Sequence, residues 1–221
     1  MLVEGTLRWR VTEDCPLDLL VGLCLRDLAG LHGVGDPPLP PVVPAVQREP
    51  ATHRAMAIAP GVEWGRDEAR AQAAAEISAL GAEWAGWWRR AVVGMNAAAS
   101  WSTLFVPPHF PAFDRELALQ DLVIERFADA VAWSNARRAE YLADDLEHRA
   151  EYSGDIVDVV RSREHELRRQ AGSFRLDIEA LPLSEKGAWV VAPDTVVISW
   201  SLRDDRAAFR DWFEPLVTAL V

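Results

Sequence analysis

The N-terminal segment combines a strand pattern with a helix pattern. Apolar residues or glycine occupy every second position from Val3 to Val11, and this period of two is typical of a β-strand with one buried face. Apolar residues then recur every three or four positions from Leu17 to Leu28, which predicts a helix. Asp14 ahead of Pro16 indicates where this helix begins, and Gly30 indicates where it ends.

Prolines are dense within residues 33–50, and they predict an extended connection. They include Pro37, Pro38, Pro40, Pro41 and Pro44. Such a segment could dock into an aromatic groove of a partner protein, but a stiff linker along the surface is the simpler interpretation. A short edge strand is expected to follow around Met56 and Ile58.

A long helix is predicted from Asp67 to about Met95, because the acidic residues in its first turn suit the helix dipole. One face carries small residues at a spacing of four, which would let another helix approach closely: Ala74, Ser78, Ala82 and Gly86. A bulky row lies beside them: Ile77, Leu80, Trp84, Trp87, Trp88 and Ala91. Two such rows predict a helix that is buried on more than one side.

A second long helix is expected after a turn-rich break at residues 105–111, where three prolines exclude a helix interior. Asp114 begins this helix, which we expect to end near Tyr152. Its predicted core face comprises Leu117, Ile124, Phe127, Ala128, Val131, Leu142 and Leu146. The sequence at 153–155 predicts a break. The residues that follow, to about Gln170, fit either a shorter helix or a strand rich in β-branched residues.

The C-terminal region returns to a period of two. Three alternating stretches predict an antiparallel meander, and they lie at residues 174–180, 189–191 and 196–202. Asp204 or Asp205 then begins a final helix, which Pro215 is expected to bend.

These elements together predict an α+β protein. A three-stranded sheet alone would leave one apolar face exposed, and the N-terminal strand has the matching alternation. We therefore expect a mixed antiparallel sheet of about four strands, built from both ends of the chain, with the long helices packed on one face and a C-terminal helix. The chain 1–221 would then be a single domain, with the proline-rich connection at 33–50 and a helical insertion at about 65–170.

Composition and charge narrow the function classes. The 221-residue chain carries a net charge of −11, so we expect no binding to nucleic acid. No membrane association is expected, because no apolar run is long enough for a span and the first residues lack the basic start of a secretory signal. Cys15 and Cys24 lie too far apart along one predicted helix for a disulfide. A cytoplasmic protein is expected, and Lys186 as the single lysine beside many arginines favours a bacterial, GC-rich source.

Motifs for catalysis or cofactors are weak in this sequence. The glycines of residues 30–35 lack the spacing of a phosphate-binding loop, and no metal or cofactor is expected. The densest groups of metal-ligand types are Asp144, Asp145, Glu147, His148, Glu151, Glu164, His165 and Glu166. Asp144 and His148 lie one helical turn apart, as two ligands would, but neighbouring arginines favour a salt-bridged helix surface. His109 lies between prolines in an aromatic loop and is a candidate for binding, although such a loop can also pack as a lid over its own core.

Tryptophan is unusually frequent, with ten residues in the chain. Trp84, Trp87 and Trp88 directly precede Arg89 and Arg90. Tryptophan and arginine are enriched at binding hot spots, so these five residues are candidates for a partner interface or a ligand pocket. Core packing is the alternative, since the adjacent Trp87 and Trp88 cannot face one direction.

Two hypotheses for the function remain. The first is a non-catalytic protein-interaction or assembly module of a bacterial cytoplasmic complex, which docks on a protein partner or forms a homo-oligomer. The second is a small-molecule-binding protein or enzyme with a Trp- and Arg-lined pocket between sheet and helices, acting on an acidic ligand. The lack of a catalytic constellation in the sequence favours the first, non-enzymatic hypothesis.

Overall fold

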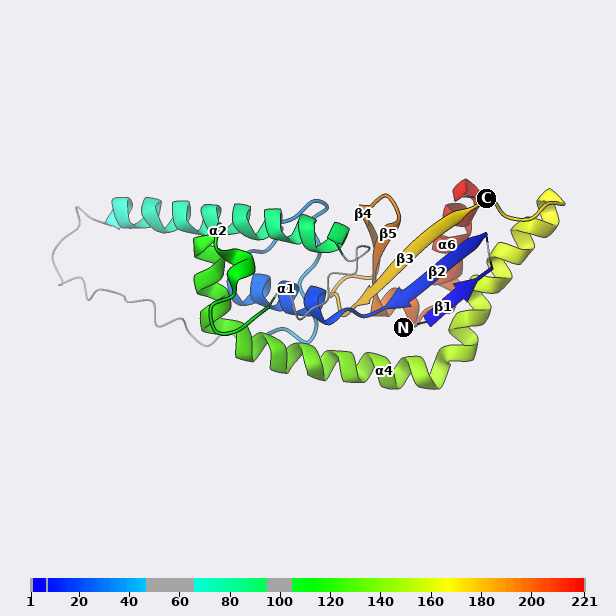
Figure 1. Cartoon of the computed structure of the whole chain (residues 1–221), viewed down its shortest axis with the longest axis horizontal. Coiled ribbons are helices and arrows are strands. Elements are labelled where there is room, and N and C mark those ends of the chain that lie inside the picture. Colours follow the sequence, from blue (N-terminus) through cyan, green and yellow to red (C-terminus); the bar gives the residue numbers. More distant parts are fainter. Residues whose placement is uncertain (1, 7, 47–65, 95–104, 221) are drawn as a thin grey trace.

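The computed structural model describes residues 2–6, 8–46, 66–94 and 105–220, and it shows an α+β protein. The strands form one mixed five-stranded sheet in the order β1-β2-β3-β5-β4, which lies towards one end of an elongated molecule (Figure 1). Their bounds are β1 Leu2–Gly5, β2 Trp9–Asp14, β3 Phe174–Leu181, β4 Ala188–Ala192 and β5 Thr195–Ser199. The edge strand predicted around Met56 and Ile58 lies outside the described residues.

The N-terminal alternation forms two strands rather than one. β1 and β2 pair antiparallel, with Leu2 opposite Glu13. Gly5 permits the tight connection, because a Cβ atom there would lie 2.2 Å from the carbonyl oxygen of Trp9. β2 then pairs in parallel with β3, where Trp9 lies beside Phe174. This pairing confirms that both ends of the chain build one sheet.

The three C-terminal strands are confirmed, but they do not form a meander. β4 and β5 make an antiparallel hairpin, whereas β3 pairs in parallel with β5. Burial explains this order, because every residue of β5 is buried while β4 is half-exposed at the edge. β5 ends at Ser199 rather than Leu202, because the Ser199 side chain accepts a hydrogen bond from the Leu202 amide and begins a helical turn.

Helices make up most of the remaining described chain. Their bounds are α1 Leu17–Leu28, α2 Arg66–Gly94, α4 Leu117–Leu167, α5 Trp200–Arg203 and α6 Arg206–Leu220, with a short 3₁₀ helix η2 at Pro111–Phe113. The predicted α1, α2 and α6 are confirmed. Asp14 does not begin α1, because it lies in β2 and Pro16 is the N-cap. Asp205 does begin α6, since its Oδ1 accepts from the Ala208 amide at 3.1 Å. Among the described residues, no helix combines the length and apolarity that crossing a bilayer requires.

α4 continues through residues 153–155, so the predicted break is wrong and the residues that follow are helical. The polar side chains at this point bind other elements. Ser153 Oγ donates to Glu4 Oε1 at 2.6 Å, and Asp155 accepts from Arg206 Nη2 at 2.9 Å. Because these side chains have partners outside the helix, they do not compete for its backbone hydrogen bonds.

The core face of α4 differs from the apolar stripe expected from the sequence. Leu117, Ile124, Ala128, Leu142 and Leu146 are exposed, and Phe127 and Val131 are only half-buried. The buried face includes Leu119, Val123, Ala130, Ser134, Tyr141, Asp145, Tyr152, Asp155 and Ile156. α4 packs against α1 and α2 and then against β1 and α6, and it changes direction on the way (Figure 1). These neighbours, rather than local apolarity, decide which face is buried.

The small residues of α2 do not contact another helix over most of their row, contrary to the prediction. Ala74, Ser78 and Ala82 are exposed, because the N-terminal part of α2 extends beyond its neighbours (Figure 1). The helix is buried only where Trp84, Trp87 and other bulky residues meet the core. The prediction of a helix buried on more than one side is therefore wrong for the first half of α2.

The part of the proline-rich connection that the structure describes packs against α1. Arg26 is fully buried and donates through Nη1 and Nη2 to the carbonyls of Leu39 and Pro40, each at 2.8 Å. Asp27 binds Arg26 at 2.7 Å and accepts from the Val42 amide at 2.7 Å. The buried ion pair thus satisfies backbone groups that an extended segment leaves open, which supports the interpretation as a stiff connection.

Candidate functional site

A cavity of about 170 Å³ lies between α4, the end of β3 and α5. The side chains that give it its chemistry are Tyr141, Asp144, Tyr152, Trp200, Arg203 and Asp204. Trp200 and Arg203 are the first and last residues of α5, Asp204 follows α5 directly, and the other three come from α4. The site therefore forms only when the C-terminal strands bring α5 against the long helix.

Arg203 is the buried cation of this cavity, with a side chain that is 2% exposed. Its Nε atom donates to Glu13 Oε1 at 2.9 Å and to Oε2 at 3.1 Å. The guanidinium lies between two aromatic faces, 4.0 Å from the ring centroids of both Tyr152 and Phe209. Nη1 forms an ion pair with Asp155 Oδ2 at 3.5 Å, but neither Nη1 nor Nη2 has a hydrogen-bond acceptor among the described residues. Two strong donors at the cavity wall are thus left without acceptors.

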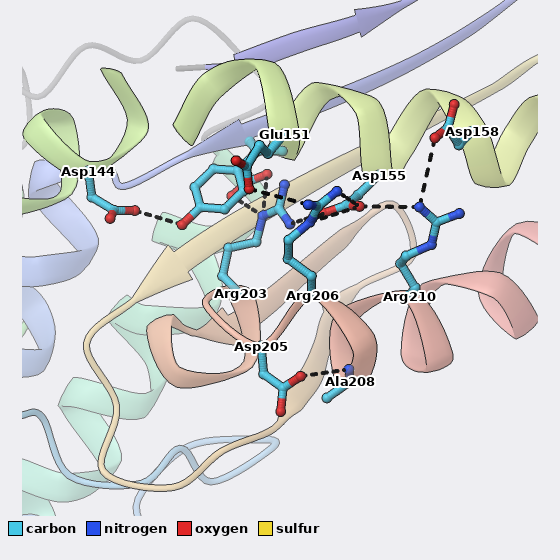
Figure 2. Close-up of polar contacts among 11 residues, drawn as sticks. Asp144, Glu151, Asp155, Asp158, Arg203, Asp205, Arg206, Ala208 and Arg210 are labelled. Carbon is cyan, nitrogen blue, oxygen red and sulfur yellow. Dashed lines mark hydrogen bonds and ion pairs between the residues drawn. The ribbon is translucent and has the colours of Figure 1, made fainter. Parts of the chain in front are cut away.

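Two buried carboxylates hold Arg203 in this position. Burial raises the pKa of Glu13, and the charge and hydrogen bond of Arg203 oppose that rise. Asp155 lies among three arginines, since Arg206 Nη2 and Arg210 Nη1 reach its Oδ1 at 2.9 and 3.3 Å (Figure 2). Burial acts to raise the pKa of Asp155, but the hydrogen bonds and charges of these arginines outweigh it and hold that pKa below its usual value. The arginine cluster therefore keeps an ionised carboxylate beneath the cavity.

Carboxylates line the solvent-facing side of the cavity. Asp144 has a side chain that is 44% exposed, and its Oδ2 accepts from the Tyr152 hydroxyl at 2.7 Å. His148 Nδ1 lies 3.0 Å from Asp144 Oδ1. Asp204 is exposed as well, and partial burial followed by the charge of Asp144 raises the pKa of Asp204. Asp144 and Asp204 thus place two carboxyl groups on the same side of the cavity.

Aromatic rings form the remaining walls. Tyr141 and Trp200 are stacked, with ring centroids 6.3 Å apart, and Trp200 Nε1 donates to the Ala180 carbonyl at 3.0 Å. Burial raises the pKa of Tyr141, so its hydroxyl stays protonated. This buried hydroxyl has no hydrogen-bond partner among the described residues. Tyr141 therefore adds a third unused donor to the two of Arg203.

The tryptophans predicted as binding residues lie in the core. Trp84, Trp87 and Trp88 are 1%, 4% and 2% exposed. Trp84 and Trp88 are stacked at 5.2 Å, and Trp84 Nε1 donates to the carbonyl of Gly22 at 2.9 Å. Gly22 allows α1 to approach, because a Cβ atom there would lie 2.4 Å from the Trp87 ring. The cluster packs α2 onto α1, which favours the core-packing interpretation of these rings.

The other predicted binding residues lie on the surface and apart from the cavity. Arg89 is exposed, and Arg90 is paired with Glu116 at 2.6 Å. His109 is exposed too, and its carbonyl accepts from Gln120 Nε2 at 2.8 Å. A role of these side chains in binding stays a prediction. The structure brings none of them to the cavity.

The acids and histidines of α4 are largely engaged in local pairs. Asp145 is buried and paired with Arg149 at 2.8 Å, and Glu166 is paired with Arg163 at 2.9 Å. Over residues 2–46, 66–94 and 105–220, apart from residue 7, no group of three or more ligand-type side chains could hold a metal ion.

Sequence reasoning missed the cavity, although it singled out Asp144 and His148 nearby. One signal in the sequence is Glu13. It follows the apolar residues Trp9 and Val11 at every second position, on the same face of the strand, and is therefore buried. A carboxylate that stays ionised in the core needs a cation or hydrogen-bond donors beside it. The sequence contains many arginines, and nothing in it indicates that Arg203 is the one that pairs with Glu13.

These features define an α+β protein with a small, aromatic-walled polar cavity beside a mixed sheet. No family model matches the chain, and neither the curated proteins nor the solved structures contain a match to it.

Proposed function

We propose that this protein binds a small molecule in the cavity between β3, α4 and α5. The observation that carries the proposal is the set of buried donors at the cavity wall, Nη1 and Nη2 of Arg203 and the Tyr141 hydroxyl, which lack acceptors within the described chain. A buried donor without a partner costs about 1–3 kcal/mol, so a ligand that supplies acceptors would be stabilised by this wall.

The cavity has the general character of the Trp- and Arg-lined pocket expected between sheet and helices, although with Trp200 and Arg203 in place of the residues predicted. Its walls combine apolar rings with a few convergent polar groups, which is the usual composition of a small-molecule site. Arg203 is held in place by Glu13, so the donors are oriented before a ligand arrives. The proposal concerns binding and includes no chemical step.

A thermal-shift screen tests the proposal. The full chain would be heated with a panel of amino acids, organic acids, amines, sugars and nucleosides, and a bound compound should raise the melting temperature with its concentration. Isothermal titration then compares the best compound on the wild type and on Tyr141→Phe, which removes one unused donor. We expect binding to weaken by about tenfold, since a hydrogen bond of this kind is worth roughly 1 kcal/mol or more.

Tyr141→Phe is a suitable variant because it removes a buried group that has no described partner and leaves the ring stack with Trp200. Its melting temperature without ligand should equal or exceed that of the wild type. Asp211→Asn on the exposed side of α6 is the control and should leave binding unchanged. If no compound binds in the millimolar range, or if Tyr141→Phe binds the best compound as tightly as the wild type, the proposal is wrong.

A second candidate is the interaction or assembly module of a bacterial cytoplasmic complex. The observation that favours it is an apolar surface patch formed by Val3, Leu142 and Leu146, whose exposed fractions are 45%, 43% and 77%. Val3 and Leu146 line one shallow groove, and Leu142 lies one turn before Leu146. We propose a second copy of this chain as the occupant, because an isologous contact would cover the patch of both copies at once.

Light scattering during size-exclusion chromatography tests the second candidate. The molar mass should rise towards that of a dimer as the protein concentration increases, and more steeply at high salt, which screens the repulsion between two chains of net charge −11. Leu146→Ser should abolish the rise, whereas Leu117→Ser on a distant exposed position of α4 should not. A monomeric mass at every concentration and salt would rule out this candidate.

A further inference from the structure

We infer that the cavity takes a small zwitterion, a molecule with a carboxylate and an ammonium group a few atoms apart, such as a free amino acid. This inference rests on the proposed small-molecule binding and specifies its ligand. The observation behind it is the division of the cavity into two chemical sides. Arg203 and Tyr141 offer donors on the buried side, whereas Asp144 and Asp204 offer carboxylates on the solvent-facing side.

The buried side suits a carboxylate. Arginine presents planar donors that match the two oxygens of a carboxylate, and Nη1 and Nη2 of Arg203 are the two that no described acceptor uses. The Tyr141 hydroxyl can add a third hydrogen bond. Arg206 and Arg210 also surround Asp155 beneath Arg203, so three guanidinium groups face one buried carboxylate there. Glu13, Glu151 and Asp158 also pair with these arginines, so a carboxylate would be recognised through the unused donors of Arg203 and Tyr141 rather than through a net positive charge.

The solvent-facing side suits an ammonium group. Asp144 and Asp204 both line the cavity, and a cation beside the two carboxylates would relieve their repulsion. Partial burial and then the charge of Asp144 raise the pKa of Asp204. The rings of Tyr141, Tyr152 and Trp200 line the same cavity, and aromatic faces attract cations. His148 competes for this role when it is protonated, since its Nδ1 atom lies 3.0 Å from Asp144. Among the described residues, the Asp204 carboxylate has no ion pair within 4 Å.

Molecules with only one of the two charges fit less well. A simple organic acid would place its charge near Arg203 but would approach past Asp144 and Asp204, which repel it. A simple amine would satisfy these carboxylates and leave the donors of Arg203 unused. The volume of about 170 Å³ limits the ligand, since a cavity of roughly 150 Å³ holds one benzene molecule. The ligand is thus only slightly larger than benzene, as a small aliphatic amino acid is.

Isothermal titration of the full chain with three matched compounds tests the inference. L-leucine carries both charges, 3-methylbutylamine lacks the carboxylate, and 4-methylpentanoic acid lacks the ammonium group. We expect L-leucine to bind about tenfold or more tightly than either analogue, because each charge-assisted hydrogen bond contributes at least that factor. Glycine, L-valine and L-phenylalanine, titrated in the same way, show which side chain the rings accept.

Two variants locate the recognition. Asp204→Asn should weaken binding of the preferred amino acid but not of its acid analogue, while Asp211→Asn on α6 should change neither. Tyr141→Phe should weaken binding of the amino acid and of the acid analogue, but not of the amine. If an acid or an amine alone binds as tightly as the matching amino acid, the inference is overturned.

The two proposals fail in distinguishable ways. If other compounds of the thermal-shift panel bind and no amino acid does, the cavity is a small-molecule site and the assignment to a zwitterion is wrong. If no compound binds at all, both proposals are wrong. If amino acids bind and their affinity is unchanged in both Asp204→Asn and Tyr141→Phe, binding occurs elsewhere and the assignment to this cavity is wrong.

Discussion

Arg203 and Glu13 form an ion pair in the core, in which Nε of the arginine donates a bifurcated hydrogen bond to the two carboxylate oxygens at 2.9 and 3.1 Å. The residues are 190 positions apart in the chain. Glu13 lies on β2 and Arg203 ends α5, so the pair joins the N-terminal hairpin to the C-terminal strands. The same pair fixes the position of the guanidinium beside the cavity, where Nη1 and Nη2 have no hydrogen-bond acceptor among the described residues.

Replacing Glu13 should be among the most damaging single changes. Glu13→Ala leaves the guanidinium of Arg203 buried without its main carboxylate, and breaking a buried pair in this way costs about 3–5 kcal/mol. Chemical denaturation would measure the free energy of unfolding. Arg163→Ala is the control, since it breaks an exposed pair with Glu166 and should cost less than about 1 kcal/mol. Equal losses in the two variants would show that the buried pair has no special role.

Glu179 should make the protein more stable in mildly acidic solution. Its side chain is buried, and burial followed by the charges of Asp14 and Asp177 raises the pKa of Glu179 well above its usual value. A carboxyl group whose pKa is raised by folding holds a proton more tightly in the folded state. Its stabilising effect is therefore complete below the unfolded pKa and is lost as the pH rises through the folded pKa.

The free energy of unfolding should accordingly increase by about 1 kcal/mol or more between about pH 7.5 and about pH 5. Glu179→Gln should flatten this increase and raise the stability near neutral pH, because an amide has no charge to bury. Glu185→Gln, at an exposed position of the following turn, should keep the wild-type dependence on pH. An unchanged dependence in Glu179→Gln would contradict the prediction.

Two glycines should respond oppositely to alanine. In Gly22→Ala, the new methyl group would lie 2.4 Å from the Trp87 ring, and overpacking of this kind costs about 1–3 kcal/mol. Gly154 lies inside α4 with no neighbouring atom within 4 Å of an added Cβ. Gly154→Ala should therefore stabilise the protein by about 0.5–1 kcal/mol. Thermal unfolding of both variants checks the prediction, and a gain in Gly22→Ala would contradict the close packing of α1 on α2.

Asp27 should hold the proline-rich connection against α1. Asp27→Ala removes the carboxylate of a buried pair with Arg26 and leaves the Val42 amide without its acceptor. We expect a loss of about 3 kcal/mol or more and faster proteolysis between residues 33 and 46. His32→Gln is the control, because His32 is 54% exposed and lies 3.9 Å from Asp27. Identical digestion of the two variants would contradict this role of Asp27.

The candidate site was only partly accessible from the sequence. The spacing of Asp144 and His148 by one helical turn marks this region in the sequence, and in the structure Asp144 lines the cavity with His148 beside it. Trp200 was assigned to a strand, since the apolar alternation continues past Ser199. The cap formed by the Ser199 side chain turns the chain into α5 and aims Arg203 inward, and this cap competes with the strand pattern over only a few residues.

The sequence by itself determined most of the strands and helices, but not the boundaries at residues 153–155 and 199–202. The alternation at 3–11 and 174–180, and the helical spacing at 17–28, are local periodicities, which depend only on which side of a segment is buried. The α+β class follows from the order of these segments. Local pattern also placed the glycine that ends α1 and the aspartate that begins α6.

Only the tertiary structure decided how these segments meet. The inner position of β5, the buried face of α4 and the pairing of Glu13 with Arg203 depend on contacts between residues far apart in the chain. Apolar side chains such as Leu142 and Leu146 stay exposed, while Asp145 and Asp155 are buried on the same helix. A buried charge is stable there because its partner arrives from another element, and a local pattern carries no information about that partner.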